Sequence, residues 1–159
     1  MALIETARFL DRDVDDNDHA LGPADARLTL VEYGSYACPR CRMADAEVAR
    51  LRDQFSERLR YVFRQRPLRD NPLARRAAEL AECAQDEEQF WRIHAQLMSR
   101  SAALTETDLQ VVVEDLQLDN LPPEEADRRM AAARARVDRD EHSSHASGVA
   151  FTPTFFING

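Results

Sequence analysis

The order of apolar and polar positions predicts a strand, a helix and a second strand in the first part of the chain. Residues 28–33 form a short, mostly apolar and β-branched run that stops at Gly34, which is typical of a strand buried on both faces. From Pro39 to about Leu59, apolar residues recur at helical spacing with charged residues between them, and this pattern indicates an amphipathic helix. The apolar residues expected on its buried face are Met43, Ala46, Val48, Leu51 and Phe55. Residues 60–64 return to strand character, so we predict a βαβ unit with parallel strands.

The remainder is predicted to be mainly helical. Residues 11–18 carry five Asp and little that could pack, so we expect a solvated lead-in, followed by a turn at residues 21–23. Asn71 and Pro72 suit the N-cap and first position of a helix. The expected helices span residues 73–84, 87–98, 106–116 and 122 to about 145. Residues 148–159 end the chain with a β-prone stretch.

Composition limits the class of protein. The chain has 159 residues, of which 44% are apolar, which suits one domain, or one domain with a large insertion, that needs no disulfide scaffold. The 29 acidic side chains outnumber 21 basic ones, all Arg, and this balance argues against a nucleic-acid partner. No apolar stretch is long enough to span a membrane. Glu5 and Arg8 interrupt what would be the apolar part of a signal peptide, so we expect a cytoplasmic chain, with export as the alternative if a further segment precedes residue 1.

The cysteines carry the candidate chemistry. Three cysteines in a reducing compartment point to redox catalysis or metal binding and not to structural disulfides. Cys38 and Cys41, separated by Pro39 and Arg40, lie at the start of the predicted helix, and their spacing allows the two sulfurs to form a small disulfide ring. The helix N-terminus, together with Arg40 and Arg42, favours a thiolate at Cys38. We therefore expect Cys38 to be the exposed nucleophile and Cys41 the resolving thiol.

Zinc binding is the alternative for this pair, because the same spacing suits metal ligands. A zinc site needs a second pair of ligands, for which the candidates are Cys83 alone or His142 and His145 on one helix face. The placement between a strand and a helix favours redox chemistry. We therefore predict no metal site, and we expect Cys83 to be a small core residue.

Two motifs in this order resemble a known family. Residues 31–41, VEYGSYACPRC, and residues 148–159, GVAFTPTFFING, look like the DsbA-like thioredoxin-fold thiol-disulfide oxidoreductases. Residues 60–68 and 89–94 are similar to that family's second strand and inserted helix. The resemblance runs from about Asp18 to the last residue. It implies an α/β thioredoxin fold with a helical insertion between the second and third core strands.

The resemblance also implies roles and boundaries. It assigns the attacking thiol to Cys38, the resolving thiol to Cys41 and a cis-proline to Pro153, with no bound cofactor. We divide the chain into an acidic lead-in at 1–19, a first thioredoxin half at 20–71, an inserted helical domain at 72–147 and a cis-proline loop with a core strand at 148–159. A thioredoxin fold would continue past Gly159 into another strand and helix. We therefore expect an open sheet edge that pairs in a homodimer or is covered by the N-terminal segment, or else a truncated chain.

Further residues complete the expected site. Glu32 lies on a buried strand, where a carboxyl group is costly unless it is protonated or used, and a raised pKa would suit it to take the Cys41 proton. The alternative is that Glu32 lies at a hydrated strand edge. A cis bond between Thr152 and Pro153 would expose the Thr152 backbone to an extended substrate. Pro39 and Arg40, beside the nucleophile, are the other expected substrate contacts.

The sequence therefore predicts a thiol-disulfide oxidoreductase. Its expected partners are protein or peptide thiols and disulfides and a redox protein that recycles the cysteine pair, with no membrane partner. The residues do not fix the direction of the reaction. The alternative is a non-catalytic, peptide- or partner-binding thioredoxin-like module whose cysteine pair is redox-sensitive.

Overall fold

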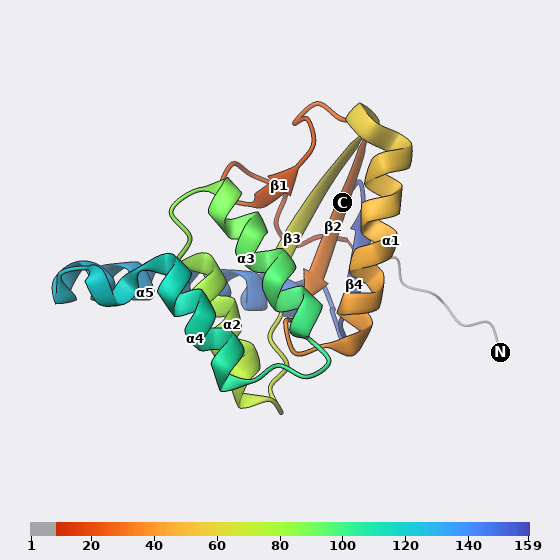
Figure 1. Ribbon diagram of the computed structural model, residues 1–159. Helices are drawn as coiled ribbons and strands as arrows, with labels where there is room; N and C mark the ends of the chain where they lie inside the picture. Colours follow the sequence, from red (N-terminus) through yellow and green to blue (C-terminus); the bar gives the residue numbers. More distant parts are fainter. Residues whose placement is uncertain (1–8) are drawn as a thin grey trace.

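A four-stranded sheet in the order β1-β3-β2-β4 forms the centre of the fold (Figure 1). The computed structural model describes residues 9–159; Glu5 and Arg8, on which the argument against a signal peptide rests, lie outside this range. The strands are β1 (His19–Leu21), β2 (Leu28–Gly34), β3 (Leu59–Gln65) and β4 (Thr154–Ile157). β2 and β3 are parallel, with Leu30 beside Tyr61, which confirms the predicted βαβ pairing. β1 and β4 run antiparallel to their neighbours and form the two outer strands.

Helix α1 (Pro39–Phe55) connects β2 to β3 and is followed by a short 3₁₀ turn, η1 (Ser56–Arg58). The predicted apolar face of α1 is only partly right: Val48 is buried, but Met43 is 73% exposed and Leu51 is 37% exposed, and Ala46 is also exposed. The face that packs inward instead follows Cys41, Val48 and the half-buried Phe55, one residue every second turn. Helix α1 lies near the β4 edge of the sheet (Figure 1), and Leu51 lines a cavity there with Phe55 and Ile157.

Four α-helices and the 3₁₀ turn η2 (Leu118–Asn120) lie between β3 and β4 and gather beside the β1 half of the sheet (Figure 1). The helices are α2 (Pro72–Glu82), α3 (Glu87–Arg100), α4 (Glu106–Leu116) and α5 (Pro123–Ala146). Their ends agree with the sequence-based boundaries to within two residues. Asn71, Asp86 and Thr105 cap three of them by accepting hydrogen bonds from backbone amides. The proposed division of the chain into domains stays a prediction.

The central strands are covered on both faces, as predicted for buried parallel strands. On one face, which we call the α1 face, Leu30, Tyr61 and Phe63 pack in the cluster that includes α1 and α3. On the other, which we call the Arg64 face, Val31 and Val62 pack in a smaller cluster with the N-terminal segment. No helix within residues 9–159 has the length and apolar composition to cross a membrane.

The expectation of a solvated lead-in at residues 11–18 holds for Asp11, Asp13, Asp15 and Asp16, which are exposed, but is wrong for Asp18. Asp18 is buried and receives two hydrogen bonds from the buried guanidinium of Arg64, at 3.0 and 2.9 Å. The same guanidinium donates to the backbone carbonyls of Arg12 and Asp13. Asp18 therefore anchors the end of the acidic run to the Arg64 face, because its partner Arg64 lies on β3.

The expected turn at residues 21–23 also needs correction, because strand β1 occupies its first position. The turn itself follows at Gly22, whose φ of 95° favours glycine. A Cβ atom at Gly22 would lie 2.2 Å from the carbonyl oxygen of Leu59. β1 is short and polar at His19, so the apolar pattern did not reveal it.

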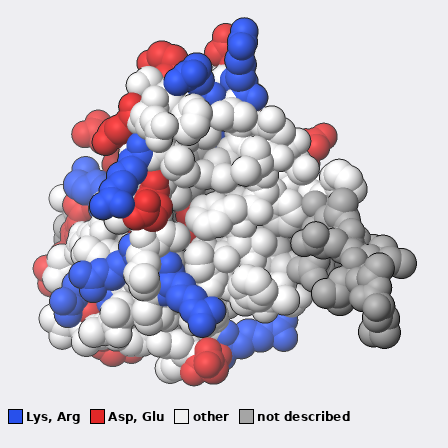
Figure 2. Space-filling view, turned by 90° about the vertical axis from the view of Figure 1, so that its right-hand side faces the viewer, with Lys and Arg blue, Asp and Glu red and all other residues white. Residues whose placement is uncertain are grey.

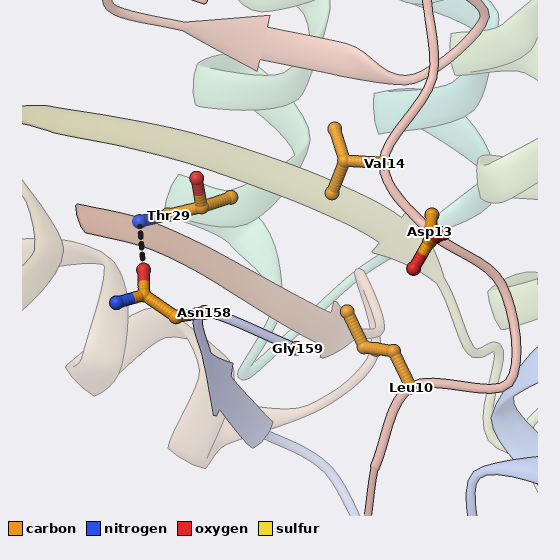
Figure 3. Close-up of a pocket in the computed structure, with 6 residues that line it drawn as sticks. All are labelled: Leu10, Asp13, Val14, Thr29, Asn158 and Gly159. Atoms are coloured by element: carbon orange, nitrogen blue, oxygen red, sulfur yellow. Dashed lines mark hydrogen bonds between the residues drawn. The ribbon is translucent and has the colours of Figure 1, made fainter. Parts of the chain in front are cut away.

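The end of the chain extends the pairing of β2 with β4. The amide of Asn158 donates to Thr29 O at 2.9 Å, and the Asn158 side-chain oxygen accepts from Thr29 N at 2.9 Å (Figure 3). Leu10, Asp13 and Val14 lie across from this pair and line a cavity of about 300 Å³ with it (Figure 3). The described N-terminal residues thus reach the Arg64 face and the end of β4, while β4 remains the outer strand.

Candidate active site

Cys38 lies where β2 turns into α1 and is the N-cap residue of that helix. Its sulfur accepts a hydrogen bond from the backbone amide of Cys41 at 3.2 Å. Pro39 occupies the first helical turn, where a missing amide hydrogen costs nothing. The Cys38 sulfur also lies 3.5 Å from the carbonyl oxygen of Thr152, to which the thiol can donate. Cys38, Cys41 and Cys83 are all free thiols.

The surroundings of the pair separate the acidities of its two thiols. Hydrogen bonds from the Cys41 thiol and from the backbone amides of Cys41 and Arg40 lower the pKa of Cys38 to about 5, against the opposing effect of burial. The hydrogen bond with Cys38 and burial raise the pKa of Cys41 well above its usual value. The contribution of Arg40 comes from its backbone amide. At neutral pH, Cys38 is therefore the thiolate and Cys41 the protonated partner.

Access to the nucleophile differs from the expectation. The sequence predicts an exposed Cys38, but in the structure Cys38 is only 4% exposed and Cys41 is fully buried. The neighbouring Pro39 and Arg40 are exposed. Phe151 is 65% exposed in the loop that carries Thr152. The exposed residues around the buried cysteine pair are therefore Pro39 and Arg40 on one side and Phe151 on the other.

Glu32 lies on the α1 face of β2, the strand that leads to Cys38, and is 1% exposed. The alternative placement at a hydrated strand edge is wrong, since β2 is flanked by β3 and β4. One carboxyl oxygen, Oε2, accepts a hydrogen bond from the Tyr61 hydroxyl at 2.7 Å. The other, Oε1, is buried without a hydrogen-bond partner among the described residues. A buried acceptor left free in this way can take a proton.

Burial raises the pKa of Glu32 to about 7; the hydrogen bond from Tyr61 opposes this shift, and the charges of Asp45 and Cys38 reinforce it. The Glu32 charge in turn raises the pKa of Cys41, which places the two groups within electrostatic reach. A carboxyl group that is half-ionised near neutral pH can both accept and return a proton.

Gly34 provides space for the Glu32 carboxyl group. A Cβ atom at Gly34 would lie 2.9 Å from Oε1 of Glu32 and 2.5 Å from Cε2 of Phe63. Any side chain would therefore displace the ring or the carboxylate. The glycine that ends the strand pattern in the sequence is thus also a spacer beside the buried acid.

The second motif faces the cysteine pair. The Thr152–Pro153 peptide bond is cis, and Thr152 is buried while Pro153 is half-buried. The Thr154 hydroxyl donates to the carbonyl of Phe151 at 2.6 Å and closes the loop before β4 begins. The structure therefore brings Cys38, Thr152 and Pro153 to one place from opposite ends of the chain.

Other residues of the site were not found from the sequence. Tyr61 lies on the same face as Glu32, because the two strands are parallel and in register, so strand alternation could have revealed it. His94 and Ser101 come from α3 and contact the turn before α1. No local pattern indicates these contacts.

The remaining candidates have other surroundings. Cys83 is buried, its sulfur lies 3.2 Å from that of Met130, and burial raises its pKa to about 11. This agrees with the predicted core role. His142 and His145 are exposed near the end of α5. Within residues 9–159, no three His, Cys, Asp or Glu side chains are grouped to hold a metal ion.

Comparison with known proteins identifies a family and several solved structures that are similar to this chain. The family model described as "Thioredoxin" matches residues 14–159. A solved thioredoxin-like oxidoreductase from Silicibacter pomeroyi DSS-3 has 28% identity and a TM-score of 0.74, covering 91% of this chain and 82% of that chain. DsbA1 from Wolbachia pipientis has 21% identity and a TM-score of 0.71, with coverage of 91% and 76%. At that identity, the likeness concerns the fold.

The curated relatives of this chain are named as Na⁺/H⁺ antiporters. A Na⁺/H⁺ antiporter NhaA from Nitrosospira multiformis is 52% identical over 151 residues, which are 94% of this chain and 24% of that protein. The NhaA 1 antiporter of Salinispora arenicola is 42% identical over 147 residues, with coverage of 91% and 22%. The chain therefore spans about a quarter of the length of the curated relatives that it matches.

Proposed function

Because this chain belongs to the thioredoxin family, we propose that it is a thiol-disulfide oxidoreductase that exchanges the Cys38–Cys41 dithiol with the disulfides of proteins or peptides. The family match and the solved relatives confirm the thioredoxin fold and the DsbA-like resemblance predicted from the sequence. One observation carries the proposal. The Cys38 sulfur caps α1, beside a second thiol that remains protonated.

In the first step, the Cys38 thiolate attacks one sulfur of a substrate disulfide. A bond forms between Cys38 and that sulfur, the substrate disulfide breaks, and the other substrate sulfur leaves as a thiolate. The Cys41 amide, which donates to the Cys38 sulfur, stabilises the attacking charge. The carbonyl of Thr152 lies 3.5 Å from this sulfur, so the backbone of a bound extended segment would pass beside it.

In the second step, Cys41 resolves the mixed disulfide. Glu32 takes the Cys41 proton, and the resulting thiolate attacks the Cys38 sulfur and releases the second substrate thiolate. The protein ends as the Cys38–Cys41 disulfide, and the substrate has gained the two electrons of the original dithiol. Support for Glu32 in this role comes from its burial and from its unpaired Oε1.

The same steps run backwards when the oxidised protein meets a substrate dithiol. The redox potential of the surroundings and of a recycling partner then decides whether the protein reduces or oxidises its substrates. A low pKa at Cys38 stabilises the reduced form and favours oxidation of substrates. In the cytoplasmic setting that we propose from the sequence, the pair would instead rest reduced.

The names of the curated relatives favour a second candidate function. These antiporters contain a region like this chain within a longer protein. In this alternative, the cysteine pair responds to the redox state and alters a membrane-transport partner without turnover of protein substrates. The thiol pair would then cycle only with small thiols or a redox protein.

Turnover of a peptide disulfide under a recycling thiol separates these functions. We expect the wild-type protein to accelerate reduction of a quenched-fluorophore peptide disulfide and Cys38→Ser to lose the acceleration. Cys83→Ala serves as the matched cysteine control and should retain it. A wild-type protein that reacts stoichiometrically but shows no turnover would support the second function.

A further inference from the structure

Helix α3 contacts the active-site turn at Cys38 itself. Ser101, the C-cap residue of α3, is 3% exposed, and its hydroxyl donates to the carbonyl oxygen of Cys38 at 3.2 Å. Its own amide donates to the carbonyl of Met98, also at 3.2 Å, so the backbone that carries this hydroxyl is fixed. Buried hydroxyl groups are usually hydrogen-bonded. Here the acceptor is the carbonyl oxygen of Cys38, the residue that carries the nucleophile.

The carbonyl of Cys38 matters because it sets the orientation of the residue. It accepts from the amides of Cys41 and Arg42 at 3.0 and 3.3 Å, at the start of α1. These bonds come from α1 itself, whereas the Ser101 hydroxyl holds the same oxygen from the helical layer. The backbone of Cys38 is thereby fixed between two helices, with its sulfur 3.2 Å from the Cys41 amide.

His94, two turns earlier on α3, makes the second contact. It is 4% exposed, and its Nδ1 lies 3.0 Å from the hydroxyl of Tyr36, two residues before Cys38. The Tyr36 hydroxyl accepts a hydrogen bond from the side-chain Nε2 of Gln65 at 3.5 Å. The proton of the Tyr36 hydroxyl is therefore available to His94 Nδ1. This leaves His94 neutral, with its hydrogen on Nε2, which faces Asp45 at 3.8 Å.

The two contacts hold the turn at two points. The ring of His94 packs at 4.5 Å from that of Phe63 and at 5.1 Å from that of Trp91, so its position is set by the core and not by the turn. Tyr36 is fully buried and follows the strand that ends at Gly34. Neither Ser101 nor His94 has a part in the exchange steps described above.

We propose that α3 holds the Cys38 sulfur against the Cys41 amide, so that Ser101 and, through Tyr36, His94 are positioning residues for thiol-disulfide exchange. The inference rests on the proposed function, but it concerns the geometry around the Cys38 thiolate. The reactivity of that thiolate can be measured without turnover. It gives the helices between β3 and β4 a direct part in the reactivity of the nucleophile.

The test is the pH dependence of Cys38 alkylation by iodoacetamide in the reduced protein, with the modified residue located by mass spectrometry. Ser101→Ala should shift the alkylation profile to higher pH and slow the reaction at pH 5 by about two- to fivefold, as expected for loss of one buried hydrogen bond. At pH 8, where Cys38 is a thiolate in every variant, the rates should converge. Local damage to the fold would instead change the rate at all pH values.

Matched variants make the result specific. Ser99→Ala removes an exposed hydroxyl from the same helix turn and should leave the profile unchanged, while Ser101→Thr keeps the hydroxyl and should restore it. His94→Leu should shift the profile in the same direction, and His94→Asn, which keeps an acceptor for Tyr36, should reverse most of the shift. Identical profiles for Ser101→Ala and Ser99→Ala would overturn the proposal. If the wild-type protein shows no turnover but the variants show the expected alkylation shifts, only the proposed function is overturned.

Discussion

The Tyr61 hydroxyl donates a hydrogen bond to Glu32 at 2.7 Å across two parallel strands, on the face of the sheet that α1 covers. This contact pairs one oxygen of a buried carboxyl group and leaves the other free. Burial raises the pKa of Glu32 to about 7, and the hydrogen bond from Tyr61 opposes a further rise. The contact therefore sets the pH at which the proposed proton acceptor becomes ionised.

Replacement Tyr61→Phe should raise the pKa of Glu32 above about 7, because it removes the hydrogen bond that opposes the effect of burial. Resolution of the mixed disulfide needs ionised Glu32, so its rate should increase with pH through about 7 in the wild-type protein and at higher pH in the variant. Carbon NMR of the Glu32 carboxyl group measures the pKa directly. Tyr33→Phe, on the opposite face of β2, is the control and should leave that pKa in place. A lower pKa in Tyr61→Phe would contradict the assignment.

Glu32→Gln should slow resolution by Cys41 about a hundredfold, the usual effect of losing a general base, while attack by Cys38 stays nearly unchanged. Only the Cys41 proton needs an acceptor, since Cys38 is already a thiolate at neutral pH. Stopped-flow kinetics with a fluorescent peptide disulfide resolve the two steps. Equal slowing of both steps would show that Glu32 acts on the pair as a whole and not as a proton acceptor for Cys41.

Asp18→Asn should destabilise the protein by about 3–5 kcal/mol, because it leaves the buried charge of Arg64 without its carboxylate. The hydrogen bonds of Arg64 and Arg12 lower the pKa of Asp18 to about 2 despite burial. A carboxyl group with a depressed pKa stabilises the fold above its unfolded pKa, so this contribution is lost as the pH falls from about 4 towards about 2. Urea unfolding at pH 7 and pH 3 gives both quantities.

The exposed Asp16→Asn is the control for this prediction and should change the free energy of unfolding by less than about 0.5 kcal/mol. If Asp18→Asn were equally mild, the lead-in would not be held to the Arg64 face by this ion pair.

The open edge of the sheet should make the chain self-associate. β4 is an outer strand, and its side chains Phe155 and Ile157 are 38% and 67% exposed. Beside it lies an apolar cavity of about 240 Å³ that Leu51 and Phe55 of α1 help to line, and Figure 2 shows a broad area without charged side chains on this side of the molecule. Unpaired, apolar strand edges pair with other chains.

Sedimentation across a concentration series should therefore show a dimer that Ile157→Lys weakens at least about tenfold, since a charge on an edge strand opposes pairing. Val111→Lys, at an exposed apolar site on α4, is the control and should not affect association. A wild-type chain that stays monomeric at every concentration would refute the prediction.

The local parts of the site could be predicted from the sequence. Cys38 and Cys41 lie at a strand-to-helix junction that periodicity alone reveals, and Glu32 stands out as a charge within an apolar strand. Tyr61 was within reach of the same reasoning, because parallel register and alternation place it on the face of Glu32.

The parts that could not be predicted depend on partners distant in the chain. Asp18 looked solvated because its partner Arg64 lies 46 positions later in the chain, and no local pattern brings the two together. Ser101 is one polar residue after a helix, and only the packing of α3 beside the turn gives its hydroxyl an acceptor. Met43 follows the helical pattern but is 73% exposed. Periodicity identifies apolar faces, whereas tertiary packing decides which of them are covered.

The most direct test of the central claim is to trap the mixed disulfide. The Cys41→Ala variant, mixed at neutral pH with a peptide that contains one disulfide, should accumulate a covalent adduct of one peptide per chain, since attack by Cys38 is intact and resolution is absent. Tandem mass spectrometry of the adduct identifies the linked cysteine. The account predicts a bond from the peptide to Cys38, and none when Cys38 is also replaced by Ser. Linkage to Cys83, or no adduct in Cys41→Ala, would contradict it.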